Sequence, residues 1–299
     1  MTRPIISWAS RRGSRPASSC ANGLRLASWG AAPARLRMFA IDVVVTTSVS
    51  SRLVWNQVSN WGIVAYLIPD FHNPTGALMG DEQRADLGHA LSRARTTAVV
   101  DETLSELALD DVPTPRPLGL FVPDAVSVGS ASKAFWGGLR IGWLRAPSER
   151  VGALISSRLS LDLGAPLLEQ LVLTDLMQRR EELLSHRCAQ LRASRAALVS
   201  AVHKRLHAWR FVQPGGGLAL WCELPEPLSS ALTTAAERQH VLLASGPRFA
   251  PEGGLERYIR LPYTRPVEEL DEAVTRLAVA WEDAKRHRTA NAGRSPLVA

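Results

Sequence analysis

Ser127-Val-Gly-Ser-Ala-Ser-Lys133-Ala-Phe-Trp-Gly-Gly-Leu-Arg140-Ile-Gly142 places a lysine just after two serines and one loop before an arginine. A lysine amine can form a Schiff base with an aldehyde. Ser130, Ser132 and Arg140 can bind a phosphate through hydroxyl hydrogen bonds and a bidentate guanidinium contact. The stretch therefore indicates a site for a ligand that carries both groups, although a lysine in a polar turn, taken alone, is more often a solvated surface residue.

Short apolar runs, separated by turns and helical patterns, surround this stretch. Residues 63–68 and 97–100 predict two buried strands, and residues 125–128 predict a third that runs into the lysine. Between the first two, a helix is expected from an Asp81 cap to about Arg95, with an inner face of Leu87, Ala90, Leu91 and Ala94. Strands that alternate with helices predict an α/β fold with a mostly parallel sheet, on which ligands bind beyond the carboxyl ends of the strands.

Three polar residues lie just past the ends of these strands, so Asn73, Asp101 and Lys133 are expected in one crevice. A carboxylate keeps a pyridine nitrogen protonated, an amide can hydrogen-bond a ring oxygen, and an amine can carry a proton. Separately, Asn73 is explained as a turn former and Asp101 as a helix cap or solvated charge. The combination favours pyridoxal 5'-phosphate as the cofactor.

Five motifs follow one another along the chain in a consistent order and spacing: Asn-Pro-Thr-Gly at 73–76, Val-Val-Asp-Glu-Thr at 99–103, Gly-Ser-Ala-Ser-Lys at 129–133, Gly-Leu-Arg at 138–140, and Arg257-Tyr-Ile-Arg-Leu-Pro-Tyr-Thr264. Over roughly residues 63–284 the chain resembles fold-type I pyridoxal phosphate-dependent aminotransferases of class I/II. The sequence of residues 66–76 is most similar to that of MocR/GntR-type regulators, in which an aminotransferase-like domain follows a winged-helix DNA-binding domain.

The resemblance implies the PLP-transferase fold type I and a role for each motif residue. Lys133 would be the Schiff-base lysine, Asp101 the partner of the pyridine nitrogen, and Asn73 the contact to the ring oxygen. The phosphate would be bound by Ser130, Ser132 and Arg140. The sequence departs from many relatives just after Asp101, where Thr103 and Leu104 stand in the neighbourhood of a tyrosine that hydrogen-bonds the ring oxygen.

The resemblance further implies amino-group transfer between an amino acid and a 2-oxo acid, with Arg260 as the clamp for the α-carboxylate. A guanidinium suits that role because its planar fork matches a carboxylate bidentately; an arginine pairing across a sheet edge is the alternative. A homodimer is implied as well. The other functional hypothesis is an effector-sensing domain of a MocR/GntR-type regulator, weakly active or inactive, whose DNA contacts belong to a winged-helix domain.

The chain divides into five predicted segments. Residues 63–164 are expected to form the cofactor-binding large domain and 165–208 a connecting helical region with apolar Leu168, Leu171, Val172, Leu176, Leu183, Leu184 and Leu191. Residues 209–286 predict a small α/β domain with strands at 218–224 and 241–244, a helix at 230–240 and a closing helix at 267–285. A disordered tail is expected from about His287.

Residues 1–62 differ from the rest in composition. They carry eight arginines and one acid, Asp42, so the formal charge of +7 belongs to them and the remainder is neutral. Three explanations are open: a basic arm on nucleic acid, an organelle transit peptide, or a stretch read from a foreign frame of a GC-rich gene. We favour the last, because neither a phosphate-binding glycine loop, a ring-stacking aromatic nor a winged helix is recognisable there. On that view the large domain is incomplete and its stability and activity are low.

The apolar runs and the cysteines also bear on the cellular location of the protein and on metal binding. The longest apolar run, Ile41 to Val49, is too short to span a membrane and contains Asp42. Three widely separated cysteines, Cys20, Cys188 and Cys222, favour neither a disulfide framework nor a zinc site and suit a reducing cytoplasm. The sequence therefore predicts a cytoplasmic protein without a metal.

Overall fold

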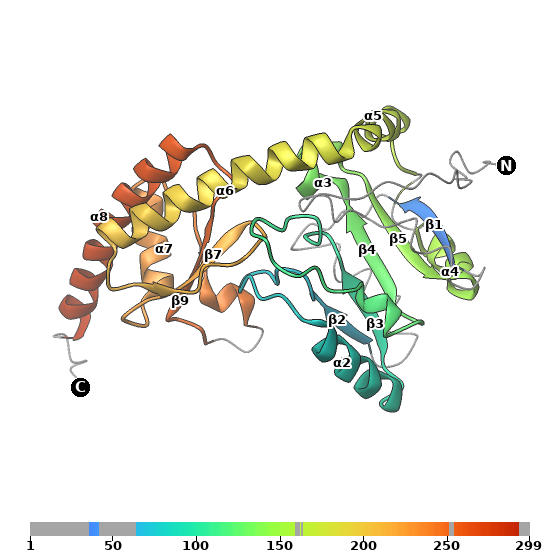
Figure 1. Ribbon diagram of the computed structural model, residues 1–299. Helices are drawn as coiled ribbons and strands as arrows, with labels where there is room; N and C mark the ends of the chain where they lie inside the picture. Colours follow the sequence, from blue (N-terminus) through green and yellow to red (C-terminus); the bar gives the residue numbers. More distant parts are fainter. Residues whose placement is uncertain (1–35, 42–63, 159–161, 163, 251–253, 293–299) are drawn as a thin grey trace.

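A computed structural model describes residues 64–158, 162, 164–250 and 254–292, together with the backbone of strand 36–41; side chains are described as far as His287. Two lobes stand side by side, and one long helix, α6 (Arg180–Arg205), runs along both (Figure 1). The prediction for residues 1–62 lies outside the described residues, except for the backbone of β1 (Leu36–Ile41).

The first lobe is built on a five-stranded sheet in the order β1-β5-β4-β3-β2. Its strands β2 (Val64–Leu67), β3 (Thr97–Asp101) and β4 (Val126–Ser130) are parallel and lie where the sequence predicts them. The sequence did not predict β5 (Gly142–Pro147), which runs antiparallel to β4 and pairs with an antiparallel β1. The α/β class is confirmed, but the sheet is mixed, because the connection 131–141 is too short for a parallel crossover.

The helix α2 (Asp81–Arg93) covers one face of this sheet, where Leu87 and Leu91 pack on Ala98 and Val100. Two details of the prediction were wrong. Gly80 occupies the N-cap position instead of Asp81, whose carboxylate accepts hydrogen bonds from the backbone N–H and Nε of Arg116 at 2.7 and 2.8 Å. Ala90 and Ala94 are exposed, and the inner face is completed by Arg84 and Gly88.

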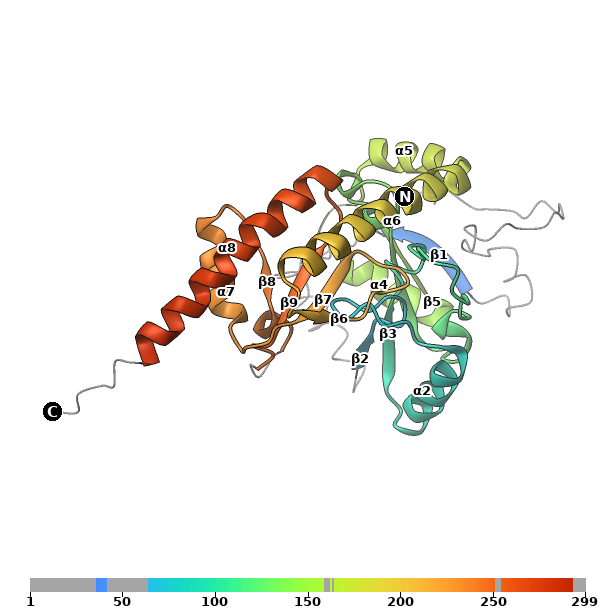
Figure 2. The same ribbon diagram turned by 60° about the vertical axis from the view of Figure 1, so that its left-hand side comes forward.

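The second lobe has a four-stranded antiparallel sheet in the order β6-β7-β9-β8. Its strands are β6 (Arg210–Phe211), β7 (Ala219–Glu223), β8 (Ala244–Ser245) and β9 (Tyr258–Pro262). The helices α7 (Ser229–Arg238) and α8 (Val267–Ala292) pack against each other, and α8 also packs on α6 (Figure 2). The predicted strand at 241–244 is reduced to the short β8, and α8 continues past the His287 at which a tail was predicted.

The connecting region forms two helices, α5 (Leu167–Gln178) and α6, as expected for residues 165–208. On α6 the buried stripe includes the predicted Leu184 and Leu191. On α5 the predicted apolar residues divide: Leu168, Leu171 and Val172 are 49–73% exposed, whereas Leu176 packs on the first lobe together with Leu173.

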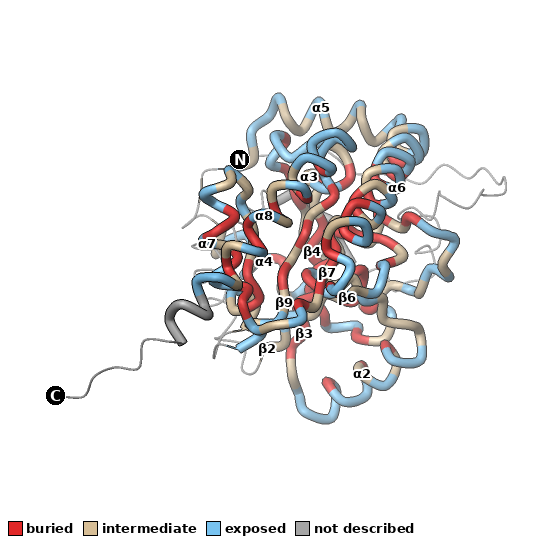
Figure 3. Tube along the Cα trace, turned by 90° about the vertical axis from the view of Figure 1, so that its left-hand side faces the viewer, coloured by how far each residue is buried: buried red, intermediate tan, exposed pale blue. Residues whose placement is uncertain are grey.

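A single hydrophobic core crosses from one lobe to the other. Phe71, Leu104, Leu107 and Leu109 belong to first-lobe loops, yet they pack in the same buried cluster as residues of α6, β7, β9 and α8. Figure 3 marks the buried stretches of both lobes in red. The ion pairs Arg180–Glu106 and Arg195–Asp110 hold α6 to the same loop. The loop after Asp101 is therefore fixed by the second lobe.

Neither a membrane-spanning helix nor a metal site occurs among the described residues. No helix in that part of the chain is long and apolar enough to cross a lipid bilayer. No group of histidine, cysteine, aspartate or glutamate side chains in the same part has the arrangement of a metal site.

Candidate functional site

The predicted site residues lie at the carboxyl ends of the three parallel strands. Asn73 follows β2 in the loop 69–76, Asp101 is the last residue of β3, and Lys133 lies three residues past β4. The strand register pairs Asp101 with Val128, so β4 continues for two residues beyond the end of β3, to Ser130. The sheet edge expected to receive these residues is the one on which they lie.

Lys133 lies on the one-turn helix α3 (Ala131–Ala134), which begins at Ser130. Its side chain is exposed at the site, yet the pKa of its amine is lowered, first by partial burial and then by the positive charges of Arg260 and Arg140. The charge of Asp101 acts in the opposite direction. The structure thus places Lys133, Asp101, Arg140 and Arg260 within electrostatic reach of one another.

Arg260 reaches this group from β9 in the second lobe. Its Nε is buried and has no hydrogen-bond partner among the described residues, and burial lowers the pKa of its guanidinium. A buried donor without a partner costs about 1–3 kcal/mol, which an acceptor from a ligand would recover. Arg260 therefore fits a carboxylate ligand better than the alternative of a structural pair across the sheet edge.

Asp101 is 9% exposed and both of its carboxylate oxygens accept hydrogen bonds. The backbone N–H of Thr103 donates to Oδ1 at 2.9 Å, and the hydroxyl of Tyr66 donates to Oδ2 at 2.5 Å. Burial and the charge of Asp101 raise the pKa of the Tyr66 phenol well above its ordinary value. Sequence reasoning missed Tyr66; the signal was its place on β2, but using it required the register of β2 against β3.

The three residues expected to bind phosphate share the turn that carries Lys133. The Ser130 hydroxyl accepts the backbone N–H of Ser132 at 3.2 Å. Arg140 is exposed and has a left-handed backbone with φ of +52°, at the end of the short 3₁₀ helix η4 (Gly137–Leu139). A non-glycine residue in that conformation costs about 1–2 kcal/mol, so the turn is held by its surroundings.

Asn73 lies in a loop that is packed tightly against the second lobe. Gly76 has φ of +72°, and a Cβ added to it would lie 2.5 Å from Cβ of Pro214. A Cβ on Gly216 would lie 2.4 Å from the carbonyl oxygen of Leu107. The Asn73 side chain is exposed, and among the described residues no hydrogen bond joins it to the other predicted site residues.

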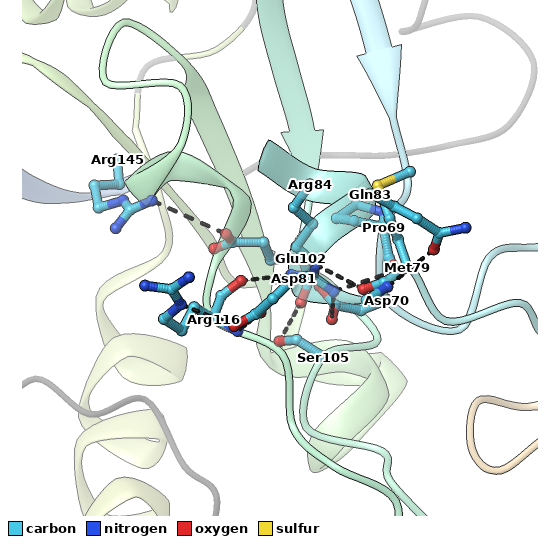
Figure 4. Close-up of polar contacts among 11 residues, drawn as sticks. Pro69, Asp70, Met79, Asp81, Gln83, Arg84, Glu102, Ser105, Arg116 and Arg145 are labelled. Atoms are coloured by element: carbon cyan, nitrogen blue, oxygen red, sulfur yellow. Dashed lines mark hydrogen bonds and ion pairs between the residues drawn. The ribbon is translucent and has the colours of Figure 1, made fainter. Parts of the chain in front are cut away.

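A buried arginine holds the start of this loop (Figure 4). Arg84, 1% exposed, donates from Nη2 to Asp70 Oδ1 at 2.7 Å, from Nε to the Met79 carbonyl at 2.8 Å and from Nη1 to the Arg116 carbonyl at 3.0 Å. These acceptors come from both ends of the loop and from the segment before β4. The guanidinium therefore fixes the loop that carries Asn73.

We expect Arg84→Met to lower the free energy of unfolding by about 3 kcal/mol, because it leaves the Asp70 carboxylate and the carbonyl acceptors buried without a donor. The matched control is Arg116→Met, whose ion pair with Asp81 is exposed and contributes less than about 1 kcal/mol. Urea unfolding followed by circular dichroism measures both. A loss in Arg84→Met no larger than in the control would contradict this account.

Glu102 belongs to the same group of polar contacts (Figure 4). It follows Asp101 directly, so the alternation of side chains along an extended chain directs it to the opposite face of the sheet. Its Oε1 lies 3.9 Å from Nη2 of Arg145, which also donates to Ser127 at 2.9 Å. Burial raises the pKa of the Glu102 carboxyl despite the attraction of Arg145. Consecutive carboxylates thus have separate roles, Asp101 at the site and Glu102 in the structure beneath it.

Comparison with known proteins gives a consistent result. A family model described as aminotransferase class I and II matches residues 64–277. The 2-aminoadipate transaminase of Thermus thermophilus is 30% identical over 223 residues, which cover 72% of this chain and 56% of that protein. An uncharacterized HTH-type transcriptional regulator, YdfD of Bacillus subtilis, is 29% identical, covering 72% of this chain and 46% of the regulator.

Among solved structures, the α-aminoadipate aminotransferase LysN from Thermus thermophilus, complexed with N-(5'-phosphopyridoxyl)-L-leucine, superposes with a TM-score of 0.69 at 28% identity. The match covers 78% of this chain and 62% of LysN. The chain spans about half the length of the curated relatives it matches.

Proposed function

Because the chain belongs to the class I and II aminotransferase family, we propose that it binds pyridoxal 5'-phosphate and transfers an amino group between an amino acid and a 2-oxo acid. The observation that carries this proposal is the grouping of one lysine amine of lowered pKa with a buried carboxylate and a buried guanidinium. The donor without a partner on Arg260 supports a site that is completed by an anionic ligand.

Lys133 would hold the cofactor and move the proton. When bound, pyridoxal phosphate supplies an aldehyde carbon for the lysine amine and a ring that withdraws electrons from the substrate's α-carbon. The lowered pKa of Lys133 increases the fraction of neutral amine, the form that acts as nucleophile and base. Its Nζ is the proposed carrier of the proton removed from the α-carbon.

The other residues would position the cofactor. Asp101 would accept a hydrogen bond from the protonated ring nitrogen. Its own two hydrogen bonds hold its carboxylate in orientation. Asn73 is the proposed donor to the ring oxygen, and the turn around Lys133 is the proposed phosphate site, with Ser130, Ser132 and Arg140. The shared position of these residues at the ends of β2 and β4 supports these roles.

Arg260 would bind the α-carboxylate of the substrate. We expect Arg260→Lys to raise KM for the amino acid roughly 10- to 100-fold with a smaller change in kcat, because an ammonium cannot replace the bidentate fork. Arg257→Lys is the matched control, since Arg257 lies three residues earlier and donates to the Pro225 carbonyl outside the site. Steady-state kinetics over a range of amino-acid concentrations measures KM for both variants. Equal KM values would show that Arg260 does not bind the substrate.

The proposed function is tested with the purified full chain and added pyridoxal phosphate. Amino donors of the classes named for the relatives, 2-aminoadipate, LL-diaminopimelate and aromatic amino acids, are paired with 2-oxoglutarate. Formation of the matching 2-oxo acid supports the enzyme. A chain that is folded by circular dichroism but shows neither cofactor absorbance nor product would overturn the proposal.

The similarity to HTH-type regulators favours a second candidate, an effector-sensing domain that uses the same site. Binding of DNA would then belong to a separate winged-helix domain. An amino acid that changes the cofactor absorbance in a single binding step, without continued formation of 2-oxo acid, would favour sensing over catalysis.

We include a homodimer in the proposal, and α5 supports it. Leu173 and Leu176 pack beside the turn that carries Lys133, while Leu167, Leu168 and Leu171 on the same helix are 55–73% exposed. Such a cluster of exposed leucines suits an interface more than a solvated surface. A second copy seated on α5 would lie next to the site, as Figure 1 shows from the position of α5 beside α3.

We expect Leu168→Glu combined with Leu171→Glu to convert the dimer into a monomer, because each change places a charge in the proposed interface. Leu242→Glu is the control, since Leu242 is a leucine outside α5 whose side chain is 81% exposed. Sedimentation velocity measures the mass of each variant. A dimer that persists in the double variant, or a wild-type monomer at micromolar concentration, would contradict an interface on α5.

Two further parts of the proposal concern organisation and location. We retain the division into a cofactor-binding domain at 63–164, a connecting region at 165–208 and a small domain at 209–286. The thiols of Cys188 and Cys222 are both buried and form no disulfide among the described residues, which supports a reducing cytoplasm as the compartment.

A further inference from the structure

We propose that Tyr66 is a positioning residue for the cofactor: its hydroxyl orients the Asp101 carboxylate and limits how strongly that carboxylate holds the proton of the cofactor's ring nitrogen. The inference rests on the proposed binding of pyridoxal phosphate. It goes beyond the roles that the resemblance implies, none of which was assigned to Tyr66. The observation is the hydrogen bond of 2.5 Å from Tyr66 Oη to Asp101 Oδ2.

The fold builds this contact. In the parallel register Tyr66 lies opposite Val99, and Asp101 is two residues further along β3. Because side chains alternate between the faces of a strand, Tyr66, Val99 and Asp101 project from the same face. A tyrosine side chain is long enough to reach the diagonal neighbour on the next strand. The contact is therefore set by the backbone of two paired strands.

The two faces of β2 have different surroundings. Ala65 and Leu67, the neighbours of Tyr66, turn toward α2 and join its apolar cluster with Ala98 and Val100. Tyr66 is 40% exposed on the opposite face, where it meets a carboxylate.

The two hydrogen bonds to Asp101 go to different carboxylate oxygens. The Thr103 N–H donates to Oδ1 from the next turn of the backbone, and Tyr66 donates to Oδ2 from a different strand. Donors on both oxygens fix the plane of the carboxylate, and each oxygen keeps a lone pair for a further donor. The raised pKa of Tyr66 means that the phenol remains a neutral donor over the working pH range.

The donor also changes the chemistry of Asp101. A carboxylate that accepts a phenolic hydrogen bond has part of its charge neutralised, so it attracts another proton less strongly. The cationic groups that face the same site are Lys133, Arg140 and Arg260. Removal of the Tyr66 hydroxyl should therefore make Asp101 a stronger acceptor toward the ring nitrogen.

The position of Tyr66 also bears on the absence of a tyrosine shortly after Asp101, where many relatives have one. Thr103 and Leu104 follow Asp101, and neither has a phenol. The chain has three tyrosines: Tyr258 stacks on Trp221, and the Tyr263 hydroxyl donates to the Gly216 carbonyl. Tyr66 is thus the tyrosine whose hydroxyl is directed to a carboxylate of the site.

The test is a pH titration of the ring nitrogen, observed by ¹⁵N NMR of labelled pyridoxal phosphate bound to the full chain. In Tyr66→Phe we expect the ring nitrogen to stay protonated to a pH roughly one unit higher than in wild type. Tyr258→Phe is the control and should titrate as wild type does. In an Asp101→Asn background, adding Tyr66→Phe should produce no further shift, because the carboxylate through which Tyr66 acts is gone.

A second variant keeps the test independent of folding in Tyr66→Phe. Incorporation of 3-fluorotyrosine at Tyr66 makes the phenol more acidic and a stronger donor, so the ring nitrogen should lose its proton at a lower pH than in wild type. Unchanged titrations in both variants would overturn the role of Tyr66. A wild-type chain that binds no pyridoxal phosphate would instead overturn the proposed function, and the two failures are thereby distinguished.

Discussion

Lys133→Ala is expected to lower the rate of amino-group transfer on the order of 10⁴-fold, because it removes both the amine that holds the cofactor and the base that moves the proton. The loss should fall on kcat, since Arg260 and the rest of the substrate site remain. The pKa of the Lys133 amine is lowered by burial and by two neighbouring guanidiniums, which increases the fraction of neutral amine available for this work.

The chain provides a matched control for this prediction. It has three lysines, and Lys204 lies exposed near the end of α6 in the second lobe. Lys204→Ala removes the same atoms far from the parallel strand ends and should retain wild-type turnover. Single-turnover measurements with amino acid and without 2-oxo acid separate the chemical step from product release. Residual activity in Lys133→Ala within about tenfold of wild type would show that another group does the chemistry.

Asp101→Asn is the second large effect, with an expected loss on the order of 10³-fold in kcat. Asparagine preserves the size of the side chain and leaves Oδ1 able to accept the Thr103 N–H, but an amide has no charge to keep the ring nitrogen protonated. The Tyr66 hydroxyl then faces either an amide oxygen or an NH₂ group. The expected loss of kcat in Asp101→Asn therefore comes mainly from the lost negative charge, and less from the changed hydrogen bond to Tyr66.

Asp111→Asn controls for the loss of one negative charge, because Asp111 is exposed in the loop that follows Asp110. Turnover, measured with saturating cofactor, should be unchanged in this control. The ring-nitrogen titration described for Tyr66 gives a second readout, in which Asp101→Asn should lose protonation at a much lower pH. If Asp101→Asn turned over substrate as wild type does, Asp101 would not be the partner of the ring.

Local sequence patterns were sufficient for the parallel half of the first lobe. The strands β2, β3 and β4 are short apolar runs bounded by turn residues, and these signals do not depend on distant contacts. The placement of Asn73, Asp101 and Lys133 past the strand ends follows from the same pattern. The strand β5 could not be predicted in this way, because its pairing depends on how the chain turns after Lys133.

Other features depended on three-dimensional contacts. The predicted apolar residues of α5 included Leu176, which packs on the first lobe with Leu173, but the pattern could not tell that Leu168 and Leu171 are exposed. Arg84 was absent from the predicted core because arginine is seldom fully buried, and besides Asp70 its partners are backbone carbonyls that no side-chain pattern reveals. Tyr66 was missed because its partner lies 35 residues away on another strand.

The central claim is that Lys133 is the residue that binds the cofactor covalently, and reduction with borohydride tests it most directly. The purified chain is incubated with pyridoxal phosphate, reduced, digested and examined by mass spectrometry. Because the chain has three lysines, each modified peptide is assigned without ambiguity. We expect the phosphopyridoxyl group on the peptide that contains Lys133, in close to one equivalent, and not on Lys204 or Lys285. Label distributed among the three lysines, or no label on Lys133, would contradict the account.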